Sequence, residues 1–265
     1  MNKQPCFSVV VVCLNAEALI GETINSILGQ TCDDFEIIVK DGMSKDGTLA
    51  SLPTNEKIRV YCEADKSVYD AMNQATHYAT GKYVIYMNCG DVFASNTVLA
   101  EVKKEIGEKR PILVYGDYER AGIRHRQPAT IRPFYLYRTP MCHQTLFFDC
   151  KTLQKMAPYD VDYKILADYD LELRLYREKC EMLYVDTVIC SYLGGGLSET
   201  EKGIRIKKEE RKAILQKHFS AAERMKYQLL WKATMPKIRG KLIVGKSPRW
   251  MKVVYQKIVN TMNKD

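Results

Sequence analysis

The first ninety residues alternate between short apolar runs and segments of helical periodicity, and this alternation limits the folds open to the chain. Phe7–Leu14, Phe35–Val39, Ile58–Cys62 and Lys82–Met87 have the composition of buried strands. Val68–Ala79 predicts a helix before the fourth strand. An apolar helix face precedes the second strand, formed by Leu19, Ile20, Ile24, Ile27 and Leu28. Because right-handed βαβ crossovers join parallel strands, we predict a Rossmann-type α/β fold with a mostly parallel central sheet flanked by helices.

The pattern from about residue 96 to residue 201 is less regular. Strands are predicted at Ile112–Tyr115, Gln144–Phe148 and Met182–Tyr192, and a helix is predicted at Asp168–Lys179. Mixed strand directions are expected there. Gly194–Gly196 follows, either as a mobile loop or as a place where backbone can approach a phosphate.

The net charge of +8 is unevenly distributed along the chain. Residues 202–265 hold 18 Lys and Arg against 4 Asp and Glu, a net charge of +14, whereas residues 1–201 hold 22 against 28, a net charge of −6. Two helical periods, Lys202–His218 and Arg249–Met262, fall in the basic part. We therefore interpret residues 202–265 as a basic helical segment with a polyanionic partner, either a lipid surface or nucleic acid.

The cysteines and the hydropathy pattern suggest a reducing compartment. Nine cysteines occur in no metal-binding spacing, and Cys13 and Cys89 lie in apolar runs, where a buried thiol is the simplest state. Residues 1–5 lack a signal-peptide pattern, and no run approaches the roughly 18 apolar residues of a membrane span. We expect a cytoplasmic location.

Carboxylates follow two predicted strands and begin one predicted helix. Asp41 follows Ile37–Lys40, Asp91 follows Asn88-Cys89-Gly90, and Asp168 begins a helix. Ligands of open α/β sheets bind beyond the carboxyl ends of the strands, so these side chains are expected to meet in one crevice. One carboxylate could contact a nucleotide base, one could hold a divalent metal, and one could take a proton, which suggests a nucleotide-sugar site.

Each of these residues also has a purely structural interpretation. Asp41-Gly42 is a good turn with Asp46 as a helix cap, and Asn88–Asp91 is a good strand-ending turn. Asp168 is suited to an N-cap, and His143 is either a satisfied polar residue or a substrate contact.

Six segments in order resemble family 2 glycosyltransferases with the GT-A fold, especially bacterial enzymes that build surface polysaccharides. The resemblance covers about residues 5–200. Its motifs are Val9–Asn15 with Glu17, Ile38–Thr48, Asp65–Asn73, Asn88–Asp91, Cys142–Gln144 and Ala167–Asp170. It implies a nucleotide-binding half to about residue 95 and an acceptor-binding half over 96–201.

The resemblance also implies roles for individual residues. Asp41 would bind the base, Asp91 would bind Mn²⁺ or Mg²⁺ at the diphosphate, and Asp168 would be the catalytic base. His143 and Asp170 would contact the acceptor. Further contacts to the nucleotide sugar are expected from Asn15, Glu17, Lys66, Asn73, Asn88 and Gly90.

Two departures from the family pattern affect these roles. Asn88 and Gly90 stand where carboxylates are common, so Asp91 is the only acid of the metal motif. Met72 stands where many members have an Arg before the Asn, so Lys66 is expected to supply the cation for the diphosphate.

The sequence thus predicts an inverting, metal-assisted transfer of a hexosyl or N-acetylhexosaminyl group to a hydroxyl of a lipid-linked or polysaccharide acceptor. The donor is a nucleotide-diphosphate sugar, with UDP as the favoured nucleotide. Residues 202–265 would hold the enzyme on the anionic inner face of the cell membrane, through a stripe that includes Met251, Tyr255 and Ile258. Packing of that stripe on protein is the alternative. A nucleotidyltransferase and a nucleic-acid-binding protein are the other functions considered, and nucleic acid is the less favoured partner.

Overall fold

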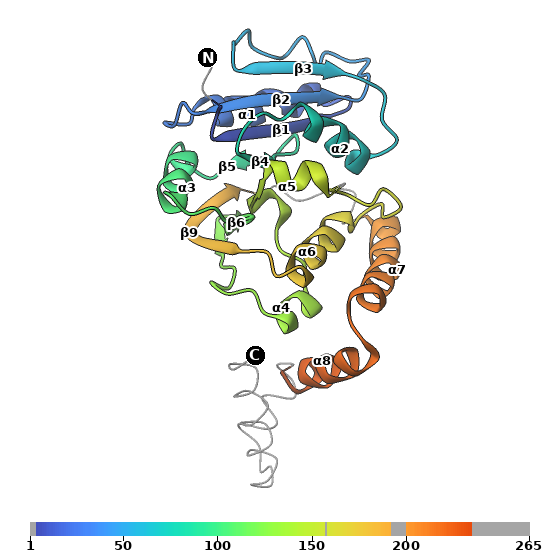
Figure 1. Ribbon diagram of the computed structural model, residues 1–265. Helices are drawn as coiled ribbons and strands as arrows, with labels where there is room; N and C mark the ends of the chain where they lie inside the picture. Colours follow the sequence, from blue (N-terminus) through green and yellow to red (C-terminus); the bar gives the residue numbers. More distant parts are fainter. Residues whose placement is uncertain (1–3, 157, 192–199, 235–265) are drawn as a thin grey trace.

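A nine-stranded sheet forms the centre of the computed structural model, which describes residues 4–156, 158–191 and 200–234 (Figure 1). The strands are β1 (Phe7–Cys13), β2 (Phe35–Asp41), β3 (Ile58–Cys62), β4 (Tyr83–Tyr86), β5 (Val92–Phe93), β6 (Leu113–Arg120), β7 (Ile123–His125), β8 (Leu146–Asp149) and β9 (Met182–Ser191). Their order is β3-β2-β1-β4-β8-β6-β9-β5, and β7 pairs with β6 at the side.

The first four strands are parallel, as predicted. β1 lies between β2 and β4, and β3 lies outside β2. All seven residues of β1 are buried, which explains why this strand is a continuous apolar run rather than an alternating one. Because Cys13 pairs with Asp41 in the register, the ends of β1 and β2 lie side by side.

The second half of the sheet is mixed, also as predicted. β8 runs antiparallel to both of its neighbours, β4 and β6, while β9 runs parallel to β6 and antiparallel to β5. β6 and β7 form a hairpin whose turn residues Ala121 and Gly122 both have positive φ. A right-handed strand twist favours such a turn between antiparallel strands.

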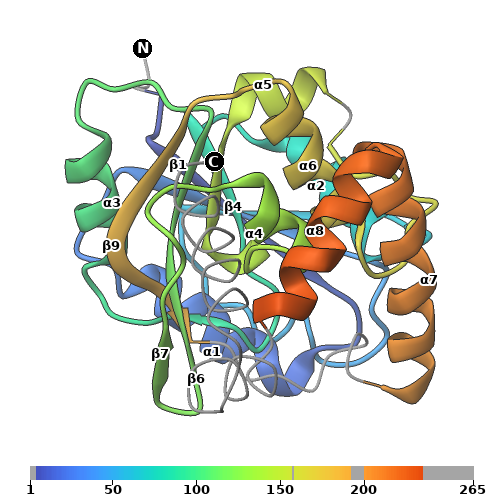
Figure 2. The same ribbon diagram turned by 90° about the horizontal axis from the view of Figure 1, so that it is seen from below.

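Helices cover both faces of the sheet (Figures 1 and 2). One face carries α1 (Glu17–Leu28) and α3 (Val98–Ile106), which share a core with one side of β1 and β2. The other face carries a larger core. Its helices are α2 (Val68–Tyr78), α4 (Pro133–Arg138), α5 (Cys150–Lys155), α6 (Ala167–Arg177), α7 (Glu201–His218) and α8 (Ala221–Thr234).

The helices α7 and α8 belong to that larger core. Ile214, Leu215, Phe219 and Tyr227 are buried in it, and the rings of Phe219 and Tyr227 both contact Tyr137 of α4. The apolar side of this part of the basic segment therefore packs on the protein, and the predicted boundary at residue 201 is the start of a helix of the same core. The predicted helix Arg249–Met262 lies outside the described residues, as does Gly194–Gly196.

No helix in the described ranges is both long enough and apolar enough to cross a membrane.

All nine cysteines are free thiols, and burial is the main cause that raises the pKa of Cys6 and of Cys150 to about 11.

Candidate functional site

Two loops at the carboxyl ends of β1 and β2 are joined by hydrogen bonds from predicted site residues. The Asn15 side-chain oxygen accepts the Lys45 N–H at 2.9 Å, and the Glu17 carboxylate accepts the Gly47 N–H at 3.0 Å. A Cβ at Gly47 would lie 2.4 Å from that carboxylate, so a larger residue there would displace the Glu17 side chain. In this structure Asn15 and Glu17 shape the loop after β2. Their contact with a donor stays a prediction.

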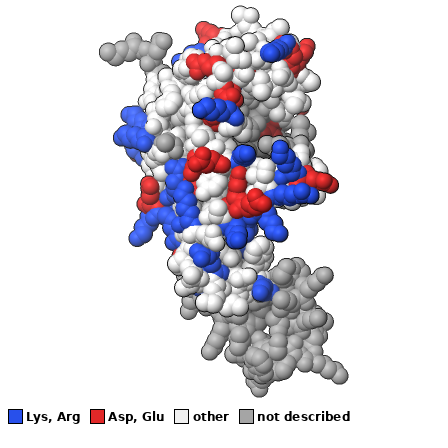
Figure 3. Space-filling model, turned by 90° about the vertical axis from the view of Figure 1, so that its right-hand side faces the viewer, with Lys and Arg blue, Asp and Glu red and all other residues white. Residues whose placement is uncertain are grey.

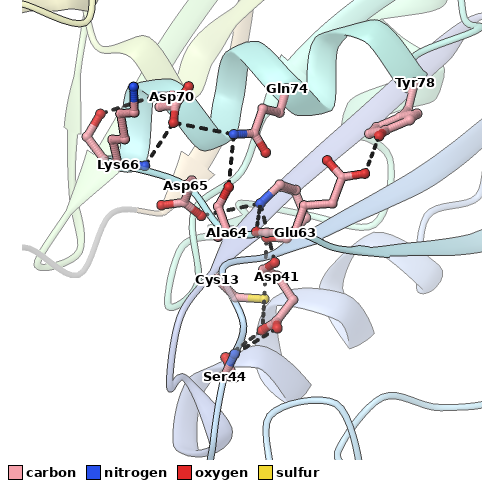
Figure 4. A network of polar contacts seen from close by, with 12 residues as sticks. Cys13, Asp41, Ser44, Glu63, Ala64, Asp65, Lys66, Asp70, Gln74 and Tyr78 are labelled. Carbon is pink, nitrogen blue, oxygen red and sulfur yellow. Dashed lines mark hydrogen bonds and ion pairs between the residues drawn. The ribbon is translucent and has the colours of Figure 1, made fainter.

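Asp41 organises the same loop. Its side chain is fully buried, and its two carboxylate oxygens accept the Ser44 N–H, at 2.8 Å, and the Ser44 hydroxyl (Figure 4). The Cys13 thiol lies 3.6 Å from the second oxygen. Both oxygens of Asp41 thus have partners in the protein, and its contact with a nucleotide base stays a prediction. One Asp46 oxygen accepts the Thr48 N–H at 3.0 Å in a turn, and the other accepts the Glu17 N–H at 3.2 Å at the start of α1, so Asp46 caps that helix from the neighbouring loop.

A buried lysine next to Asp41 marks a carboxylate that the sequence prediction did not select. Lys40 is fully buried, and its Nζ donates to the Glu63 carbonyl at 2.6 Å and pairs with Asp65 at 3.3 Å. The Asp65 side chain keeps 13% of its surface exposed. It lies so close to Gly42 that a Cβ there would approach its oxygen to 2.6 Å. The sequence held one signal for this carboxylate: Lys40 directly follows an apolar run, and a buried charge needs a partner of opposite charge.

Lys66 and Asn73 lie at the start and in the middle of α2. Lys66 is exposed, and its N–H donates to Asp70 at 2.8 Å, in the turn that opens the helix. The Asn73 amide donates to the Tyr159 carbonyl at 2.8 Å and accepts the Tyr159 N–H at 3.0 Å. Asn73 therefore joins α2 to the chain before α6. Of these two side chains, that of Lys66 is open to a diphosphate, because its ammonium group is exposed.

The turn after β4 holds Asp91 in a nearly buried position. Gly90 has a φ of +97°, and its N–H donates to the Thr23 hydroxyl at 2.9 Å. Asp91 is 6% exposed and accepts the Gln144 amide at 3.0 Å. Burial raises the pKa of Asp91, while the Gln144 hydrogen bond and the nearby His143 act in the opposite direction.

The donor set at this turn fits a hard divalent cation. The Asn88 side-chain oxygen is buried and has no hydrogen-bond partner within the described part of the chain, and Asp91 supplies one carboxylate. No cluster of three or more His, Cys, Asp and Glu exists among the described residues. One carboxylate and one amide oxygen are enough for Mg²⁺ or Mn²⁺ when diphosphate oxygens and waters complete the coordination.

His143 connects this turn to Asp168. One imidazole nitrogen lies 3.1 Å from the Asn88 amide nitrogen, and the other lies 3.6 Å from an Asp168 oxygen. The second Asp168 oxygen accepts the Tyr69 hydroxyl at 3.2 Å and the Tyr169 N–H at 2.8 Å. His143 belongs to η1 (His143–Thr145), a 3₁₀ turn directly before β8. Three segments far apart in the sequence are thereby brought together.

The interpretation of Asp168 as a helix cap is wrong. Helix α6 begins at Ala167, and its N-cap is Leu166, which makes no side-chain capping bond. Asp168 is the second residue of the helix, and its carboxylate accepts the Tyr169 N–H of the first turn without being the N-cap. The alternative role, acceptance of a proton, remains open for it.

Asp170 lies away from this network and is fully buried. It pairs with Arg174 at 3.1 Å, Lys217 at 2.9 Å and His218 at 2.8 Å. Burial alone would raise the pKa of Asp170, but the hydrogen bonds from His218 and Lys217 outweigh it, and the pKa is lowered. Asp170 ties α6 to α7, and its burial does not favour the predicted contact with an acceptor.

Glu172 is a second residue that the sequence prediction did not select. It lies one turn after Asp168, is fully buried, and accepts the Met141 N–H at 2.9 Å through one oxygen. The available signal was the spacing of four residues from Asp168, since residues i and i+4 lie on one face of a helix. Burial and the Asp168 charge hold the pKa of Glu172 well above its usual range.

Comparison with known proteins gives a consistent set of relatives. Residues 8–156 match the model of a family described as glycosyl transferase family 2. A relative from Mycobacterium bovis, named PGL/p-HBAD biosynthesis glycosyltransferase, is 33% identical over 205 residues, which cover 74% of this chain and 80% of the relative.

Solved structures share the fold. TarS of S. aureus, residues 1–349 in complex with UDP, superposes with a TM-score of 0.62 at 17% identity, covering 93% of this chain and 76% of TarS. The mannosyltransferase PcManGT of Pyrobaculum calidifontis, in complex with GDP-Man and Mn²⁺, gives a TM-score of 0.58 at 16% identity, covering 97% and 85%. The sheet and its flanking helices are thus of the GT-A type.

Proposed function

The chain belongs to glycosyl transferase family 2, and we propose that it transfers a sugar, with inversion at the anomeric carbon, from a nucleoside diphosphate donor to an acceptor hydroxyl. The observation that carries this proposal is the connection between Asp91 and Asp168. Gln144 contacts Asp91, and the adjacent His143 lies between Asn88 and Asp168. Asp91 as the metal-binding carboxylate and Asp168 as the proton acceptor would therefore face one site, as a single displacement requires.

Inversion needs one base and no covalent nucleophile. Asp168 would accept the acceptor's proton as the new glycosidic bond forms, since its side chain retains some exposure, 14%, and serves no cap. Tyr69 and the Tyr169 N–H donate to one oxygen and fix its orientation. The other oxygen, 3.6 Å from His143, faces the site and would take the proton.

Asp91 and Asn88 would hold the divalent cation, Mn²⁺ or Mg²⁺. The bound cation would supply positive charge to the departing diphosphate. Lys66, exposed at the start of α2, would add a cationic side chain to the donor site. UDP is the proposed nucleotide, because TarS, which has a similar fold, has been solved with UDP.

Calorimetry with UDP tests the donor site directly. The parent should bind UDP more tightly with Mn²⁺ than without it. Asp91→Ala should lose this metal-dependent gain. Asp41→Ala should weaken UDP binding with and without metal, since it releases the loop that Asp41 holds through Ser44. Asp33→Ala, which removes an exposed carboxylate far from the site, is the control. Parental UDP binding by both site variants would reject the proposed site.

The acceptor proposed is a lipid-linked or polysaccharide hydroxyl at an anionic membrane. Figure 3 shows Lys and Arg side chains, with acidic ones between them, spread over the side of the molecule where α7 lies. Lys207, Lys208 and Lys212 of α7 are exposed, as are Met225 and Leu229 of α8. Each basic residue near an anionic surface contributes about 1 kcal/mol to attraction.

Vesicle sedimentation tests this partner. Lys208 and Lys212 are exposed one turn apart on α7, and reversing both to Glu should reduce binding to anionic vesicles at low salt. Lys151 and Lys155 of α5, exposed at the same spacing, give the matched control. Removal of α7 is unsuitable because its buried side belongs to the core. Equal binding by both double variants would reject α7 as the membrane-facing element.

A further inference from the structure

Glu172 is a buried carboxyl group that has no cationic partner among the residues the structure describes. Its side chain is fully buried on α6, one oxygen accepts the Met141 N–H at 2.9 Å, and the other is buried without a hydrogen bond. An ionised carboxylate in such a place would be costly, because neither a cation nor a full set of donors compensates its charge.

The groups that face Glu172 are neutral or acidic. Asp168 and Tyr169 lie on its own helix, Tyr135 comes from α4, and Cys142 and Tyr159 come from the connecting segments. The Asp168 charge opposes a second negative charge one turn away. Two carboxyl groups in one place with different surroundings commonly divide into one ionised and one neutral group.

The hydrogen bond joins Glu172 to Met141, the first residue of the segment that connects the two halves of the site. The next residues of that segment are Cys142, His143 and Gln144. His143 contacts Asn88 and approaches Asp168, and Gln144 donates to Asp91. A shift of the Met141 backbone would move both contacts together.

We infer that Glu172 is a positioning residue for the transfer: as an uncharged carboxylic acid it fixes the Met141 N–H, and with it His143 and Gln144, without placing a second negative charge beside Asp168. This inference rests on the proposed function. It assigns Glu172 no contact with the substrate, and it explains why a polar residue occupies a position between the buried Leu171 and Leu173.

Glu172→Gln tests the uncharged state, because the amide keeps an acceptor for the Met141 N–H and cannot ionise. Transfer should stay within about threefold of the parent, and the acidic limb of the kcat/KM pH profile, where Asp168 gains its proton, should stay in place. If Glu172 were ionised in the parent, removing its charge would ease the ionisation of Asp168 and move that limb down by about one pH unit or more. Glu178→Gln, an exposed change at the end of the same helix, is the control.

Glu172→Leu tests the positioning, since it keeps the volume and removes the acceptor. We expect kcat to fall at least tenfold, with the affinity for UDP and Mn²⁺ within about threefold of the parent. A folded Glu172→Leu variant with parental kcat, or a shifted acidic limb in Glu172→Gln, would overturn the inference. If the Leu variant does not fold, the Gln profile decides alone. Failure of the parent itself to bind UDP or turn over a donor would instead reject the proposed function.

Discussion

Replacement of Asp168 by Asn separates the chemistry of the site from its structure. Asn keeps a side-chain oxygen that can accept the Tyr69 hydroxyl and the Tyr169 N–H, which lie 3.2 Å and 2.8 Å from one Asp168 oxygen. It removes the negative charge and the capacity to accept a proton. Asp168 caps no helix, so no capping bond is lost with the carboxylate.

The expected effects on stability and on catalysis differ in size. Loss of a negative charge in the first turn of a helix costs about 0.3 to 1 kcal/mol of folding stability. Loss of a general base slows the reaction by a factor of about 10² to 10⁴. That factor corresponds to about 3 to 5 kcal/mol in the activation free energy. The catalytic effect should therefore exceed the structural one several-fold.

Three measurements on Asp168→Asn decide the point. Thermal unfolding should show a small change in Tm, calorimetry should show parental affinity for UDP with Mn²⁺, and transfer to an acceptor should fall at least a hundredfold. Asp162→Asn, which changes an exposed carboxylate in the turn before α6, should behave as the parent in all three. Transfer by Asp168→Asn at near-parental rate would refute the assignment of the base.

Two further predictions concern stability. The pKa of Asp170 is lowered in the folded state, although burial acts in the opposite direction. Its ion pairs therefore stabilise the fold above about pH 4, and this contribution is lost as the pH falls through the lowered pKa. Asp170→Asn should therefore cost on the order of 3 kcal/mol in urea unfolding at pH 7, with a smaller difference from the parent at pH 3; equal differences at both would contradict it. A Cβ at Gly81 would lie 2.6 Å from the Ser8 nitrogen and 2.7 Å from the Phe7 carbonyl carbon, so Gly81→Ala should lower the unfolding free energy by about 1 to 3 kcal/mol. Gly21→Ala, in open space on α1, is the control and should be neutral or stabilising.

The predictable part of the fold is the part where one segment's own pattern decides its structure. β1, β2 and β4 are buried on both faces, and such strands are continuous apolar runs in the sequence. The predicted helices over Val68–Ala79 and Lys202–His218 match α2 and α7 to within one residue at each end. Partners elsewhere in the chain were not needed to predict these elements.

Several of the elements that were missed depend on distant partners or are short. β5 has two residues and exists because it pairs with the end of β9. Helix α8 was not predicted, since its apolar side is defined by contacts of Tyr227 with Phe134, Tyr137 and Phe219 from other segments. The same limit applies to the site. Glu172 and Asp65 were not selected because their partners, Met141 and Lys40, lie 31 and 25 residues away.

The direction of β8 explains why the site can form where it does. In a parallel sheet, only the residues that follow a strand reach the carboxyl edge, and those that precede it lie at the opposite edge. β8 runs antiparallel to β4, with Val84 opposite Phe148, so the residues before β8 lie beside those after β4. This single reversal brings His143 and Gln144 to Asn88 and Asp91. A family motif that precedes a strand can therefore serve the same site as a motif that follows a neighbouring strand, provided that the two strands run in opposite directions.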